Sequence, residues 1–151
     1  MARDKEPTRV IPALGNIWDS LSDFAYPLLR VSAGVILLTH GWPKVAKFGL
    51  AGVSGAMARY GIEPSTLAAI IVMFLETAGA ILIVIGLFTR PIAALLVIEF
   101  LVIIFVAHWP RGWSASAGGI EYPLLWGICF LVILIRGGGK YSVDRSIGKE
   151  I

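Results

Sequence analysis

The stretch from Ala68 to Arg90 reads AAIIVMFLETAGAILIVIGLFTR and is apolar over almost its whole length. Glu76 is the one acidic residue in this run, which is long enough to cross a bilayer, since a crossing helix needs about 20 residues. A charged side chain in lipid costs roughly 2.5–3.5 kcal/mol on insertion scales, so Glu76 requires a partner or a function. The run ends at Gly86, and Arg90 follows directly. We therefore expect a membrane-spanning helix with one paired or functional acid.

The composition of the whole chain agrees with a membrane protein. Of its 151 residues, 57% are hydrophobic, against about 45–50% in soluble domains. The net charge is +3, and the basic residues stand at the ends of apolar segments, so no clustered basic face for nucleic acid is expected. Cys129 is the one cysteine, which excludes an internal disulfide and a cysteine-rich metal site. Any redox role therefore requires a bound cofactor.

Four apolar segments have lengths near that of a bilayer-crossing helix, and lipid admits only helices or closed barrels. They cover residues 24–41, 65–88, 91–109 and 120–135. The predicted fold class is therefore all-α, a polytopic membrane protein with a four-helix transmembrane bundle. Its predicted parts are an N-terminal tail (1–22), a transmembrane domain (23–136) and a C-terminal tail (137–151). The tail carries apolar residues at helical spacing, so it is either an interfacial helix or unstructured.

The basic residues predict the orientation of the chain. An even number of spans places both termini on one side, together with eight of the counted basic residues, whereas four lie on the other side. Cytoplasmic segments carry the excess of Lys and Arg, so we expect both termini in the cytoplasm. The first group is Arg3, Lys5, Arg9, Arg90, Arg136, Lys140, Arg145 and Lys149, and the second is Lys44, Lys47, Arg59 and Arg111.

Small residues predict how the first two spans pack. One face of each span is small and weakly polar, which lets helices approach closely. In the first span this face carries Arg30, Ala33, Gly34, Leu37, His40, Gly41 and Lys44. In the second it carries Ser65, Ala68, Ala69, Val72, Glu76, Gly79, Ala80, Ile83 and Gly86. We expect these two faces to pack against each other.

Arg30 and Glu99 are the charged residues inside the first and third spans. They lie at a similar depth from the cytoplasmic side, so a structural ion pair between them is predicted. The alternatives are that Arg30 extends to the interface and that Glu99 is functional. Glu99 and His108 are nine residues apart. In a regular helix they point to roughly opposite faces and do not share a site.

Four ionisable residues come together in the outer half of an up-and-down bundle: His40, Glu76, His108 and Glu121. Trp42 borders this half. An imidazole can donate to a quinone carbonyl, and a buried carboxylate can exchange protons. The predicted site is a quinone head-group site, with Glu76 catalytic and His40, His108, Glu121 and Trp42 binding. No two of these ligand types stand at helical i, i+3 or i, i+4 spacing, so no metal is expected.

Several of these motifs together resemble the DoxX family of small bacterial membrane proteins. The most specific are Glu76 followed by Gly-Leu-Phe-Thr-Arg at 86–90, and Gly-Lys-Tyr-Ser-Val-Asp at 139–144, with the similarity covering about residues 24–144. The resemblance implies a four-helix protein of the bacterial inner membrane. The family includes the DoxD-type subunit of a thiosulfate:quinone oxidoreductase and membrane partners of redox and oxidative-stress proteins.

Two functions remain open at this point. The first is an integral membrane subunit of a quinone-linked redox system. In that case the protein could be a subunit of a quinone-dependent oxidoreductase. The second is a non-catalytic structural or assembly subunit of a larger membrane complex, in which Glu76 is paired with Lys44 or Arg30. The expected partners are the lipid bilayer and either protein subunits or further copies of this chain, but no nucleic acid. A small-molecule carrier is disfavoured, because four spans without repeats suit alternating access poorly.

Overall fold

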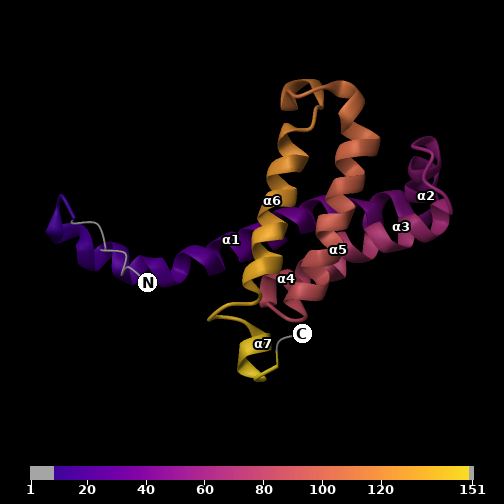
Figure 1. Ribbon diagram of the computed structural model, residues 1–151. Coiled ribbons are helices and arrows are strands. Elements are labelled where there is room, and N and C mark those ends of the chain that lie inside the picture. Colours follow the sequence, from indigo (N-terminus) through magenta and orange to yellow (C-terminus); the bar gives the residue numbers. More distant parts are fainter. Residues whose placement is uncertain (1–8, 150–151) are drawn as a thin grey trace, which may run out of the picture.

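The computed structural model describes residues 9–149, and all regular structure in that range is helical, without any strand. Three helical stretches are long and apolar enough to cross a membrane by length and composition: Pro12–Arg59, Ser65–Ile85 and Thr89–Arg111. They coincide with the first three predicted spans. The all-α class is thus confirmed for the described residues (Figure 1), and three of their helical stretches are candidate membrane spans.

The fourth predicted span is not confirmed as a membrane crossing. It corresponds to helix α6 (Glu121–Arg136), which has 16 residues and is shorter than the roughly 20 that a crossing requires. The helix ends at Gly137, whose φ of 74° breaks the helical backbone. The count of four spanning helices is therefore not confirmed, although the helix itself exists.

The first stretch is longer than predicted. It contains the 3₁₀ turn η1 (Pro12–Leu14), helix α1 (Gly15–Pro43), the π-helical turn η2 (Lys44–Phe48) and helix α2 (Gly49–Arg59). Helix α1 begins at Gly15 and not near Phe24, and its first part extends beyond the other helices (Figure 1). The predicted placement of Arg3 and Lys5 lies outside the described residues, and the division into three parts remains a prediction.

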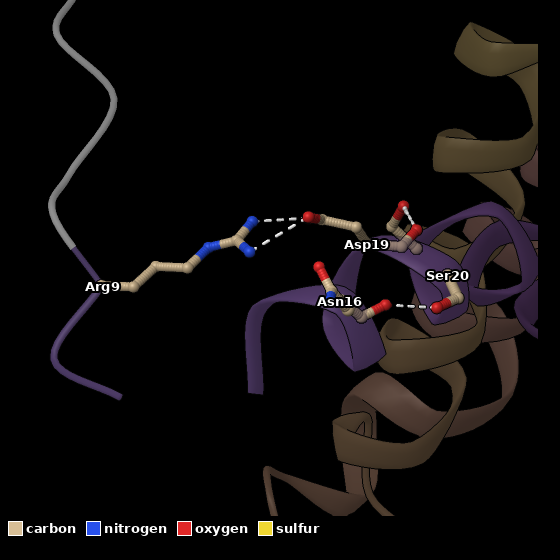
Figure 2. A network of polar contacts seen from close by, with 5 residues as sticks. Arg9, Asn16, Asp19 and Ser20 are labelled. Carbon is tan, nitrogen blue, oxygen red and sulfur yellow. Dashed lines mark hydrogen bonds and ion pairs between the residues drawn. The ribbon is translucent and has the colours of Figure 1, made fainter. Parts of the chain in front are cut away.

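A contact between Arg9 and Asp19 holds the segment before α1 to the first turns of the helix. The two guanidinium nitrogens of Arg9 donate to the two carboxylate oxygens of Asp19 at 3.0 and 2.5 Å (Figure 2). The Ser20 hydroxyl donates to the carbonyl of Asn16 in the same view. These side chains are exposed, so the contact orders the segment locally and contributes little to the stability of the fold.

The remaining elements form the second and third stretches and the C-terminal part. The second stretch consists of α3 (Ser65–Phe74), the π-helical turn η3 (Leu75–Gly79) and α4 (Ala80–Ile85). The third consists of α5 (Thr89–Val102), the π-helical turn η4 (Ile103–His108) and the 3₁₀ turn η5 (Trp109–Arg111). The 3₁₀ turn η6 (Ala115–Ala117) precedes α6, and the short α7 (Val143–Ser146) follows it.

The helices pack mainly as three pairs. Helix α1 lies against η3 and α4, whereas α5 lies against α6, and α2 folds back on α3. In Figure 1 the α5–α6 pair crosses the line of α1, α3 and α4. The shared core contains Leu37, Leu75, Ile83, Leu96 and Phe130. Most remaining large apolar side chains point outward, as expected for helices that face lipid.

Glycines on α1 allow the close approach predicted for the first two spans. A Cβ atom on Gly34 would lie 2.8 Å from the carbonyl oxygen of Ala80, and a Cβ atom on Gly41 would lie 2.0 Å from that of Glu76. Contacts this short exclude any larger residue without movement of the backbone. The predicted packing of the two small-residue faces is confirmed, and it places the backbone of Glu76 directly against α1.

The C-terminal segment closes the end of the bundle where α4 turns into α5. Helix α4 ends at Gly86 (φ 71°), and Phe88 (φ 49°) precedes α5. The buried carboxylate of Asp144 accepts hydrogen bonds from the backbone N–H groups of Phe88 and Thr89 at 2.8 and 3.0 Å, and from the Thr89 hydroxyl at 2.7 Å. Asp144 thus caps α5 from a distant part of the sequence. The two motifs of the family resemblance are therefore in direct contact.

Candidate functional site

A cavity of about 680 Å³ lies between the helices, with walls from α1, α3, α5 and α6 and from the three π-helical turns η2, η3 and η4. Its lining is mostly apolar, and its volume is in the range of ligand sites. The ionisable side chains that line it are His40, Lys44, Glu76, Glu99 and His108, joined by the hydroxyl groups of Tyr60 and Tyr122. The cavity therefore combines an apolar interior with a few polar groups.

Lys44 and Glu76 form an ion pair in the wall of this cavity. The ammonium group of Lys44 donates to a carboxylate oxygen of Glu76. The Glu76 side chain is 6% exposed, whereas that of Lys44 is 25% exposed. The charge of Glu76 is thus compensated within the chain, which is the pairing that the assembly alternative predicted. Attraction between opposite charges is strong in such a weakly polar setting.

Glu99 is a second acid that lines the same cavity. It is 7% exposed, and within residues 9–149 neither carboxylate oxygen has a hydrogen-bond partner. Burying a carboxylate without hydrogen bonds is costly, so such a group is protonated or receives a donor from a ligand. Glu99 is therefore the one acid of the cavity that the described chain leaves unsatisfied.

The predicted ion pair between Arg30 and Glu99 was wrong. The Arg30 guanidinium donates to the carbonyls of Ile83 and Val84 at 2.5 and 2.7 Å, and to that of Tyr141 at 2.6 Å. It is 1% exposed and joins the end of α4 to the C-terminal segment. Two carbonyls at the end of α4 and one in the C-terminal segment accept from its terminal nitrogens in place of an acid. It does not extend to the interface either.

His108 reaches the cavity because the third helix is distorted. Residues 103–108 form a π-helical turn, and its wider turn rotates the chain by fewer degrees per residue than an α-helix. Glu99 and His108 therefore line one cavity, because the helix departs from the regular geometry on which their predicted separation depended. The His108 Nδ1 lies 2.6 Å from the carbonyl oxygen of Gly118. Since a carbonyl only accepts, Nδ1 carries the proton, and Nε2 of a neutral ring is an acceptor.

The π-helical turns coincide with the ionisable residues of the cavity. Lys44 opens η2, Glu76 is the second residue of η3, and His108 closes η4. Such turns are rare in proteins overall, and those that occur are often found at functional sites. Periodicity at 3.6 residues per turn could not have located them. The available signal was the presence of these ionisable side chains at or inside apolar runs.

Two predicted binding residues do not line the cavity. Glu121 is exposed, and its carboxylate accepts a hydrogen bond from the backbone N–H of Ala115 at 3.0 Å, which orders the loop before α6. Trp42 is 63% exposed and suits the membrane interface. His40 does line the cavity, so the structure brings together His40, Glu76 and His108 of the predicted set.

No cluster of three His, Cys, Asp or Glu side chains that could hold a metal ion occurs among residues 9–149. Glu76 is engaged by Lys44, and the two histidines stand on separate helical segments, α1 and η4. The expectation that no metal binds stays a prediction. The chemistry available in the cavity is that of carboxylate, imidazole, ammonium and phenol groups in an apolar setting.

The fold and the cavity define a class: an α-helical membrane protein with a mostly apolar cavity that carries a few polar groups. The sequence model of DoxX matches residues 25–109. The chain belongs to the DoxX family, as its motifs predicted.

Three relatives of known sequence are similar to most of this chain. The chain is 33% identical over 123 residues to the inner membrane protein YphA of Escherichia coli K12, covering 78% of this chain and 86% of the relative. It is 30% identical over 127 residues to an uncharacterized protein of Haemophilus influenzae Rd (81% and 90%), and 28% identical over 130 residues to the inner membrane protein YqjF of Escherichia coli K12 (86% and 97%). No solved structure matches significantly. Together with the apolar helices, these relatives support a bacterial inner-membrane protein.

Proposed function

We propose that this protein is the membrane subunit of a quinone-linked redox system and binds a quinone head group in the cavity between its helices. The observation that carries the proposal is Glu99, a buried acid whose two oxygens have no partner among residues 9–149 and which lines a mostly apolar cavity. A ligand for such a cavity is lipid-soluble and brings a polar group to Glu99. A quinone meets both requirements.

The polar groups of the cavity match both redox states of a quinone. A carbonyl of the oxidised form can accept from Lys44, from a protonated Glu99 or from an imidazole N–H. A hydroxyl of the reduced form can donate to ionised Glu99 or to Nε2 of a neutral His108. Reduction of a quinone consumes protons as well as electrons, and Glu76 and Glu99 are the acids positioned to exchange protons. The electrons come from a partner redox protein.

Mass spectrometry of quinones that co-purify with the native protein tests this function. The wild-type protein is expected to retain quinone, and Glu99→Gln and Glu76→Gln to retain on the order of tenfold less, since a buried hydrogen bond to a charged group contributes about 1.5–3 kcal/mol. Glu121→Gln is the matched control, because Glu121 lies outside the cavity lining, and it is expected to retain the wild-type amount. A wild-type protein without quinone would overturn the proposal.

The Lys44–Glu76 pair favours a second candidate, a structural or assembly subunit of a larger membrane complex. In that case Glu76 is satisfied within the chain and requires no ligand. The two candidates differ in a simple observation. An assembly subunit brings a stoichiometric partner in a pull-down from native membranes and carries no quinone, whereas a quinone subunit carries quinone even when purified alone.

A further inference from the structure

A separate pocket of about 360 Å³ lies beside the C-terminal end of α6. It shares no lining residue with the cavity between the helices. Its lining contains three cationic side chains, those of Arg136, Arg145 and Lys149, together with Asp144. The remaining lining residues are small. This pocket is therefore polar and positively charged, in contrast to the apolar cavity.

The positive charge of this pocket is only partly balanced by the described chain, since three cations and one acid line it. The carboxylate of Asp144 accepts the hydrogen bonds that cap α5, which hold it in place. Within residues 9–149 the cations in ion pairs are Arg9, Lys44 and Lys140, so none of the three pocket cations is paired there with an acid. Like charges around one hollow repel one another, so an anion in the hollow would stabilise the arrangement.

The position of the pocket indicates where such an anion comes from. Arg136 ends the apolar helix α6, so the pocket lies at the level where the lipid-facing surface gives way to polar residues. The Arg136 guanidinium lies over the ring of Tyr26 at 4.6 Å, a contact that restrains it. Phe24 stacks on Tyr141 at 5.6 Å nearby in the same end of the bundle. Aromatic residues gather at membrane interfaces, where the lipid phosphates also lie.

We propose that this pocket binds a phosphate group of an anionic phospholipid. A guanidinium group forms paired hydrogen bonds to phosphate oxygens, and an ammonium group adds a compact charge. Basic pockets beside membrane helices are suited to anionic head groups. Free inorganic phosphate offers the same chemistry, so the test has to separate the two sources. The proposal is independent of the ligand of the central cavity.

The test uses the full-length protein in nanodiscs of phosphatidylglycerol mixed with phosphatidylcholine, released into native mass spectrometry. The wild type is expected to retain phosphatidylglycerol in preference to phosphatidylcholine. The double variant Arg145→Gln/Lys149→Gln is expected to retain about thirtyfold less, since each of the two basic residues contributes on the order of 1 kcal/mol near the membrane surface. The charge-conserving variant Arg145→Lys/Lys149→Arg retains it. Arg111→Gln is the control, because Arg111 lies outside the pocket.

A second arm adds excess inorganic phosphate before release. Retention that survives phosphate supports a lipid head group, and displacement by phosphate supports a phosphate site open to water. The proposal is overturned if the wild type shows no preference for phosphatidylglycerol. It is also overturned if the double variant, with an unchanged melting temperature, retains as much as the wild type and the Arg111→Gln control.

Discussion

Lys44 and Glu76 form an ion pair that joins two π-helical turns, η2 at the end of α1 and η3 in the middle of the second stretch. The pair is largely buried and lies in the wall of the central cavity. Helix α1 and the second stretch therefore contact each other in two ways: through close packing at glycine and through this ion pair at the cavity. The pair fixes the position of Glu76, whereas Glu99 across the same cavity is unpaired within residues 9–149.

Removal of one partner of the pair is expected to destabilise the protein strongly. Lys44→Met leaves the buried carboxylate of Glu76 uncompensated and lowers the free energy of unfolding by about 3 kcal/mol, the low end for buried pairs because Lys44 is partly exposed. The double variant Lys44→Met/Glu76→Leu recovers most of this loss, since no charge is left behind. Chemical unfolding in detergent micelles measures both. A single variant as stable as the wild type would contradict the pair.

The close approach of α1 to the Glu76 backbone predicts a strong effect at Gly41. Gly41→Ala places a Cβ atom 2.0 Å from the carbonyl oxygen of Glu76, so the helices must separate at a cost of about 1–3 kcal/mol. Gly55→Ala is the matched control in helix α2, where the nearest atom is the end of the Arg59 side chain at 3.7 Å. Thermal unfolding is expected to show a lower melting temperature for Gly41→Ala and an unchanged or higher one for Gly55→Ala.

Asp144 is expected to be essential for the end of the bundle. Asp144→Ala leaves three donors of Phe88 and Thr89 unsatisfied and lowers the free energy of unfolding by about 2–4 kcal/mol. Asp23→Ala is the control, because its pair with Lys140 is about half exposed on both sides and contributes little. Equal stability of the two variants in urea unfolding would show that Asp144 does not cap α5.

Local patterns in the sequence predicted much of the fold. The small-residue faces identified the packing of α1 against the second stretch, because close packing depends on residue size at helical spacing. The apolar runs identified three membrane-crossing stretches. Helix α6 was found close to its predicted bounds, but its 16 residues are fewer than the roughly 20 of a membrane crossing. Family motifs identified Asp144 without explaining that it caps α5.

The site was only partly predictable, because it depends on departures from regular helices. The turn η4 brings His108 to the cavity that Glu99 lines, and no residue pattern marks such a turn. The positions of Arg30 and Glu99 in their predicted spans placed them at a similar depth in the membrane. Their opposite charges could not show that backbone carbonyls accept the hydrogen bonds of Arg30. His40, Glu76 and His108 were brought together as predicted, whereas Glu121 and Trp42 were not.

We expect Glu99 to serve ligand binding while lowering the free energy of unfolding of the protein. Glu99→Leu removes a buried carboxylate that has no partner within residues 9–149 and puts an apolar side chain of similar size in its place. Such a replacement is expected to be neutral or stabilising by about 1–3 kcal/mol. The cavity loses its unsatisfied acid at the same time, so the quinone binding that we propose is expected to be lost. Gains in stability with loss of function are typical of residues that serve a site.

The most direct test is to measure the melting temperature and the quinone content of the same purified Glu99→Leu sample, beside wild type. The account predicts that the melting temperature is unchanged or higher and that quinone falls by on the order of tenfold or more. A Glu99→Leu protein that keeps the wild-type amount of quinone, or that loses quinone only because it unfolds at a lower temperature, would contradict it.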